Sequence, residues 1–157
     1  MLNNLRQVAL SLIFLAVSTS SCTHGPESPD DPKGRLQEYI SKSFAVRTVE
    51  DKKELVAFLT GDSKARLAAW SDDQFREAFI DSKRQFLKMA FREVKQINPT
   101  EVSVTYELTY LDQGKGRDAK VTNKKLAQML RENGKWMVGV VRNIKELVEY
   151  QNEVSLP

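Results

Sequence analysis

The chain has 157 residues, enough for one domain with a sizeable core. It carries 24 basic and 21 acidic residues, so it lacks the strong basic excess that marks nucleic-acid-binding domains. A single cysteine and a single histidine exclude a disulfide framework, a thiolate zinc site and most histidine-dependent hydrolysis within this sequence. We therefore predict no catalytic residue, no metal, no cofactor and no nucleic-acid partner.

The first 21 residues are predicted to be an export signal. An apolar run of about ten residues, positions 8–17, follows Arg6. As a helix this run would reach roughly 15 Å, about half of a bilayer core, so it is too short for a permanent membrane anchor. Residues 22–33 contain three prolines among small and acidic residues, a composition typical of a flexible tether. We therefore expect a single folded domain over residues 34–157.

The region after the tether predicts four short helices. An apolar stripe of period 3.6 indicates the first of them and comprises Leu36, Tyr39, Ile40 and Phe44. Thr48 with Asp51 and Ser71 with Gln74 have the spacing of capping boxes, which begin further helices. Gly61 is predicted to end the second helix, because glycine readily adopts the left-handed conformation.

The segment Ser82–Asn98 fits two structures. Its apolar residues satisfy a helical stripe and a bulged strand about equally. We predict a helix that ends near Lys88, followed by a strand from Met89 to Ile97. A turn follows at Asn98-Pro99, because the residue before a proline avoids the helical region.

The stretch from Glu101 to Val141 predicts three consecutive antiparallel strands. Glu101–Tyr110 alternates between apolar and polar residues with a period of two, which is typical of a half-buried strand. Asn133-Gly134 lies between the strands 121–132 and 135–141. This dipeptide tolerates the positive φ angles of a type I′ turn and therefore predicts a hairpin.

The two-residue turn also predicts the register of this hairpin. The expected cross-strand pairs are Glu132 with Lys135, Arg131 with Trp136, Leu130 with Met137, and Met129 with Val138. The residues predicted for one face are Ala127, Met129, Trp136, Val138 and Val140. Those predicted for the other are Leu126, Leu130, Met137 and Val141. We expect one face to meet the helices and the other to meet a second element or a partner.

A short closing helix is predicted after the hairpin. Asn143 and Glu146 have capping-box spacing, and Ile144, Leu147 and Val148 recur at helical intervals. The fold class predicted for the whole chain is α+β, with N-terminal helices packed on a twisted antiparallel sheet of about four strands.

This order of elements resembles the nuclear-transport-factor-two-like fold. The resemblance covers Arg35 to about Tyr150 and rests on Glu101–Tyr110 (EVSVTYELTY) and Gly134–Val141 (GKWMVGVV). It implies a cone whose helices and curved sheet enclose a pocket, which in that family is catalytic, empty or a dimer surface. It implies no individual functional residue, because fold does not determine function.

The small residues before Cys22 resemble the lipobox of bacterial lipoproteins. In that family the cysteine is acylated and becomes the mature N-terminus, so the resemblance implies lipidation of Cys22 and attachment to a membrane. Thr23, in place of aspartate, resembles lipoproteins sorted to the outer membrane, facing the periplasm. The alternative is an ordinary cleaved signal that leaves a free thiol.

Four residues are predicted to line a binding surface: Tyr106, Tyr110, Met129 and Trp136. Aromatic and polarisable side chains commonly line ligand pockets, but they also form ordinary cores. A basic run lies on one connection and the following strand and comprises Lys115, Arg117, Lys120, Lys124 and Lys125. It is interpreted either as a contact for an anionic surface or as a solvated sheet edge protected from aggregation.

The expected function is that of an envelope-anchored binding or scaffolding module. Its partner would be a small apolar ligand, an envelope polymer or a protein, and the sequence predicts no oligomeric state. The alternatives are a pocket enzyme, such as a hydrolase or isomerase, and a purely structural envelope component. A buried carboxylate or a tyrosine pair in an open cavity would favour the enzyme. An exposed apolar sheet face would favour a protein partner.

Overall fold

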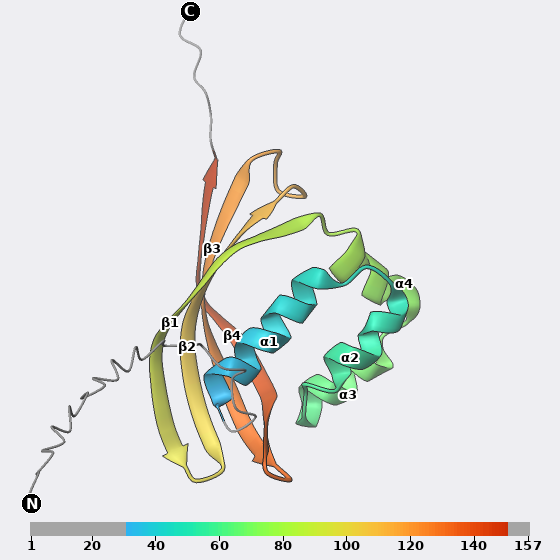
Figure 1. Cartoon of the computed structure of the whole chain (residues 1–157). Helices are drawn as coiled ribbons and strands as arrows, with labels where there is room; N and C mark the ends of the chain where they lie inside the picture. Colours follow the sequence, from blue (N-terminus) through green and yellow to red (C-terminus); the bar gives the residue numbers. More distant parts are fainter. Residues whose placement is uncertain (1–30, 151–157) are drawn as a thin grey trace, which may run out of the picture.

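The computed structural model describes residues 31–150 and confirms the predicted α+β class. A group of short helices precedes a four-stranded antiparallel sheet, and Figure 1 shows the helices on one side of that sheet. The elements in chain order are α1 (Pro32–Ala45), η1 (Val49–Asp51), α2 (Lys52–Val56), α3 (Gly61–Ala69), α4 (Asp72–Phe75), η2 (Arg76–Ile80), β1 (Arg84–Asn98), β2 (Glu101–Asp112), β3 (Ala119–Glu132) and β4 (Lys135–Tyr150).

Local capping residues set where the helices begin. The Asp31 carboxylate accepts hydrogen bonds from the backbone N–H groups of Lys33 and Gly34, and Pro32 occupies the first turn. Helix α1 therefore begins within the segment that composition predicts as a tether. Two of the three predicted capping boxes are present, at η1 and at α4, whereas the third, Asn143 with Glu146, lies within strand β4. Gly61 has the expected positive φ of 55°, but it opens α3 and does not end the preceding helix.

The sheet is a simple meander in the order β1-β2-β3-β4. Asn133 and Gly134 have φ angles of 50° and 77°, as the type I′ turn requires. The four predicted cross-strand pairs next to this turn are all confirmed. The Arg131 guanidinium carbon lies 5.8 Å from the centroid of the Trp136 ring, a cation–π distance.

Two predicted helical segments are strands in the structure. The prediction of a helix that ends near Lys88 is wrong, because β1 already begins at Arg84. The closing helix after Asn143 is also wrong, because β4 continues to Tyr150. In both places the neighbouring strand offers unpaired backbone groups over its full length, and pairing with it satisfies more hydrogen bonds than a short terminal helix would.

Bulges in β4 explain why its sequence resembles a helix. The register with β3 shifts between Gln128 and Met129 and again between Lys124 and Lys125, which leaves Gly139 and Ile144 unpaired. Each extra residue changes the spacing between inward-facing positions from two to three. As a result Val141 faces the helices opposite Ala127, whereas the unbulged register predicts that Val140 does so.

The core lies between the helices and the inner face of the sheet. Its fully buried residues include Leu36, Leu55, Phe75, Val104, Tyr106 and Met129. The opposite face of the central strands carries polar side chains, among them Thr105, Glu107, Lys120 and Lys124. No helix among the described residues is long and apolar enough to cross a membrane.

Candidate functional site

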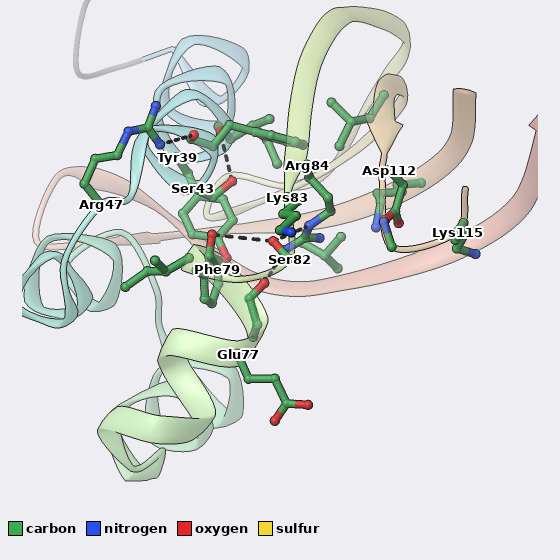
Figure 2. Close-up of a pocket in the computed structure, with 18 of the residues that line it drawn as sticks. Tyr39, Ser43, Arg47, Glu77, Phe79, Ser82, Lys83, Arg84, Asp112 and Lys115 are labelled. Atoms are coloured by element: carbon green, nitrogen blue, oxygen red, sulfur yellow. Dashed lines mark hydrogen bonds between the residues drawn. The ribbon is translucent and has the colours of Figure 1, made fainter. Parts of the chain in front are cut away.

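A cleft of about 900 Å³ opens between the helices and the sheet (Figure 2). Its helical side comes from α1, from η2 and from the turn that leads into β1. Its sheet side comes from β2, β3 and β4, together with the connection between β2 and β3. The lining residues are Tyr39, Ile40, Ser43, Phe44, Arg47, Trp70, Glu77, Ala78, Phe79, Ile80, Ser82, Lys83, Arg84, Tyr106, Leu108, Asp112, Gly114, Lys115, Lys125 and Val141.

Tyr106 and Lys125 are two of the polar residues on the sheet side of the cleft. They are directly paired in the β2–β3 register, so both side chains project from the inner face at the same level. The Tyr106 side chain is fully buried, and its hydroxyl has no hydrogen-bond partner among the described residues. Burial, reinforced by the neighbouring Tyr39 phenol, raises the pKa of Tyr106, so this hydroxyl keeps its proton and is available as a donor.

Lys125 is half-buried on the apolar face of its strand. Burial lowers the pKa of its ammonium group, the positive charge of Arg84 lowers it further, and Glu146 opposes the shift. No hydrogen bond or ion pair of the Lys125 side chain is found within residues 31–150. The fold therefore places a cation in a partly desolvated position without neutralising it.

Arg84 stands at the mouth of the cleft where β1 begins. Its guanidinium donates hydrogen bonds to the Ala78 carbonyl at 2.5 Å and to Ser82 Oγ at 3.1 Å. It also lies 6.0 Å from the centroid of the Phe44 ring. The preceding residue, Lys83, has a φ of 47°, a conformation that residues other than glycine adopt at a cost.

The charge of the lining is unbalanced toward positive. Its five basic residues are Arg47, Lys83, Arg84, Lys115 and Lys125, against two acidic residues, and four basic residues remain when Lys115 is set aside as the ion-pair partner of Glu146. Asp112 accepts the Gly114 backbone N–H at 3.1 Å, and Figure 2 shows Glu77 directed away from the other labelled side chains. The cleft therefore favours negative charge.

The helical wall of the cleft is largely aromatic. Phe44 packs 5.7 Å from Tyr110 and 5.6 Å from Phe86, measured between ring centroids. Farther along, Phe79 lies 6.2 Å from Trp70. These rings give the cleft an apolar wall facing a cationic floor.

The four predicted binding residues separate in the structure. Tyr106 lines the cleft, whereas Tyr110, Met129 and Trp136 lie in the core outside its lining. The Tyr110 hydroxyl accepts a hydrogen bond from Asn123 Nδ2 at 3.1 Å, so it is satisfied internally.

Lys125 was placed by sequence reasoning only within the basic run. The structure divides that run, because Lys125 turns inward while Lys115 and Lys120 pair with Glu146 and Glu149 at 2.5 Å and 2.9 Å. The interpretation of the basic run as a sheet edge protected from aggregation is wrong, because β3 lies between β2 and β4 and is not an edge strand. The sequence contains a signal for this position, because alternate residues of a strand share one face and this spacing puts a lysine on the apolar face. The residues on that face are Val121, Asn123, Lys125, Ala127 and Met129.

Within the described part of the chain, no group of three His, Cys, Asp or Glu side chains could hold a metal ion. Cys22, the predicted lipidation site, and the predicted signal lie outside the described residues. Their assignment stays a prediction.

Comparisons with known proteins support the fold alone. No family model matches the chain, and no curated protein sequence matches it either. Among solved structures, it resembles a SEC-C motif containing protein from Rhodopseudomonas palustris, with a TM-score of 0.54 and 13% sequence identity. The alignment covers 75% of this chain and 82% of the other.

This similarity corrects the expected family. The resemblance to lipoproteins with a nuclear-transport-factor-two-like domain is wrong, since the matching structure is a SEC-C motif containing protein. That resemblance rested on helices followed by a twisted sheet. Such an order satisfies general packing rules and therefore occurs in more than one family.

Proposed function

We propose that this protein is a binding module that holds a small molecule with an apolar body in the cleft between α1, η2 and the sheet. The observation that carries the proposal is a cavity of about 900 Å³ with an aromatic wall and two polar groups, the Tyr106 hydroxyl and the Lys125 ammonium, for which residues 31–150 provide no hydrogen-bond or ion-pair partner. Ligand sites typically consist of an apolar concavity with a few convergent polar groups. An ordinary core pairs its buried polar groups internally, so the unpartnered hydroxyl of Tyr106 supports a site.

The proposal can be tested by filling the cleft. Ser43 on α1 is half-buried and lines the cleft, whereas Ser41 on the same helix is exposed and does not. Binding of the neutral fluorescent probe phenylnaphthylamine should be lost in Ser43→Trp and kept in Ser41→Trp. Circular dichroism should show both variants to be folded. Equal binding by the two variants, or no binding by the wild type, would contradict the proposal.

A pocket enzyme is the second candidate. The features that favour it are the tyrosine pair Tyr39 and Tyr106 and the lowered pKa of Lys125, since a lowered pKa makes an amine easier to deprotonate and a neutral amine can act as a general base. Hydrolysis of a chromogenic ester at a rate that Lys125→Met abolishes would support it. Burial raises the pKa of both tyrosines, so their role would be donation and not proton abstraction.

A protein partner on the outer sheet face receives less support. The central strands present mainly threonine, glutamate and lysine there, with Leu126 and Leu130 half-buried among them, and an apolar interface would need a larger contiguous exposed patch. The exposed apolar residues lie instead on the edge strands, with Phe86, Leu87, Val94 and Ile97 on β1 and Ile144, Leu147 and Tyr150 on β4. Attachment to the envelope through acylated Cys22 remains a separate prediction, which mass spectrometry of the membrane fraction can test.

A further inference from the structure

We infer that the ligand of this cleft is an apolar organic acid whose carboxylate is bound by the ammonium group of Lys125, with Arg84 as a second cation at the mouth. This inference rests on the proposed binding function and specifies the chemical class of the ligand. It depends on the placement of Lys125, on the groups that surround this residue and on the character of the opposite wall.

Lys125 occupies a position that the fold alone does not explain. It projects from the inner face between Asn123 and Ala127, both of which are buried. On the neighbouring strand its partner is Tyr106, which is also buried. A lysine that only needed solvent would be more stable on the outer face, where Lys124 is exposed.

The acidic groups near Lys125 do not neutralise it. Among the described residues, the carboxylate that raises the pKa of Lys125 is that of Glu146 on β4, the register partner of Asn123, and it already bonds Lys115 at 2.5 Å. Asp112 is engaged by the Gly114 backbone, and Glu77 points elsewhere. Arg84 lines the same cleft and its positive charge lowers the pKa of Lys125, so an anion bound near both cations would reduce this repulsion as well as gain an attraction.

Tyr106 supplies an independent sign of an anionic ligand. Its buried hydroxyl keeps its proton and has no acceptor among the described residues. A carboxylate oxygen that reached the floor beside Lys125 would accept from this hydroxyl. Hydrogen bonds from a neutral donor to a charged acceptor are among the stronger ones in proteins.

The aromatic and aliphatic residues of the cleft indicate that the rest of the ligand is apolar. Tyr39, Phe44 and Phe79 present rings, and Ile80, Leu108 and Val141 present aliphatic groups. A strongly hydrated anion such as free phosphate would gain nothing from this surface. An alkyl or aryl acid would bury its body against the rings while its carboxylate meets Lys125.

Competition against phenylnaphthylamine tests this inference in the full-length protein. The competitors are decanoate, decanol and decyl phosphate, which share one alkyl chain and differ in the head group. We expect decanoate to displace the probe at a concentration about tenfold lower than decanol, the factor expected for one charge-assisted hydrogen bond. This preference should disappear in Lys125→Met and persist in Lys124→Met, whose substitution lies one residue away on the outer face.

The outcomes of this competition test the carboxylate preference and the binding function separately. Equal displacement by decanoate and decanol would overturn the carboxylate inference and leave the binding function intact. Stronger displacement by decyl phosphate would replace the carboxylate with a phosphate ester and also overturn the inference. Failure of the wild type to bind the probe would instead overturn the proposed function.

Two further variants keep the test independent of folding defects in Lys125→Met. Arg84→Gln lies at the exposed mouth and should weaken decanoate more than decanol. Tyr106→Phe removes only a hydroxyl and should do the same. A preference for decanoate that is unchanged in both variants would contradict the assignment.

Discussion

Tyr106 and Lys125 each reduce the stability of the fold at the position where they lie. The buried Tyr106 hydroxyl, which has no partner within residues 31–150, retains its desolvation cost, and the half-buried Lys125 ammonium is both desolvated and repelled by Arg84. Natural sequences tend to keep such locally unfavourable residues where function requires them. The two residues are also directly paired across β2 and β3, which favours one shared site over two separate defects.

This interpretation predicts opposite effects for two similar substitutions. Tyr106→Phe should leave stability unchanged or raise it by up to about 1 kcal/mol, because it removes a buried donor for which the described residues provide no acceptor. Tyr110→Phe should cost about 1 kcal/mol, because it removes the acceptor of the Asn123 amide. Urea denaturation of the two variants measures both changes. A loss of stability in Tyr106→Phe would show that its hydroxyl has an internal role.

The lowered pKa of Lys125 predicts a dependence of stability on pH. Between this lowered value and the ordinary lysine value of about 10.4, the unfolded chain binds more protons than the folded one, so stability rises with pH. At pH values below the lowered pKa, Lys125 is protonated in both states and the full cost of burying its charge reduces the stability of the fold. Arg84 and Glu146 act on the ammonium in opposite directions, and the Tyr106 phenol opposite it stays protonated.

Lys125→Met should therefore be more stable than the wild type at neutral pH, by at most about 1 kcal/mol because solvent screens a partly exposed charge. The advantage should shrink as the pH approaches 10.4. Thermal unfolding across this range, with Lys124→Met as the control for general charge effects, provides the measurement. A constant difference at every pH would contradict the assigned shift.

Sequence reasoning placed Tyr106 at a binding surface but did not assign Lys125 a site role. An aromatic residue on the apolar side of an alternating strand is a recognisable candidate. Recognising Lys125 requires knowing that β3 is central and that Tyr106 is its partner, which is information about pairing between strands. The helical side of the site, including Tyr39 and Arg84, depends on how helices pack on the sheet and is not encoded in any local pattern.

At the level of helices and strands, periodicity succeeded where the strands are regular. The β2 alternation and the Asn133-Gly134 turn are reproduced residue by residue. Periodicity failed in β1 and in the second half of β4, where bulges interrupt the pairing. A bulged strand has inward positions at mixed spacings of two and three, and over a short window this spacing cannot be told from a helical stripe.

The bulge at Gly139 predicts a sensitive position. A Cβ atom added there would lie 3.3 Å from the Gln128 carbonyl oxygen and 3.2 Å from Leu130 Cδ1. Backbone cannot retreat as a flexible side chain can, so Gly139→Ala should destabilise the protein by about 1–3 kcal/mol. Gly114→Ala is a suitable control, because its nearest neighbour is the flexible Asp112 carboxylate. Equal denaturation midpoints for the two variants would contradict the bulge geometry.

For the molecule as a whole, both the helices and the sheet contribute residues to the cleft, but these residues come from a limited part of the chain. All of its lining residues lie between Tyr39 and Val141. The similarity to a SEC-C motif containing protein covers three quarters of the chain and concerns the architecture, not the cleft. Within residues 31–150 a continuous hydrophobic core joins the helices to the sheet, and Asp31 caps the first of these helices.

A fragment comprising residues 31–150 is accordingly expected to fold and to bind phenylnaphthylamine as the full chain does. A fragment comprising residues 33–150 lacks the Asp31 cap and the first-turn proline, and it should be less stable by about 1 kcal/mol. Binding should survive this second truncation, because the cap lies at the start of α1, before Tyr39, the first residue of the lining. Urea denaturation and probe titration of the two fragments test both statements. If residues 31–150 fold without binding the probe although the full chain binds it, segments outside this range complete the site.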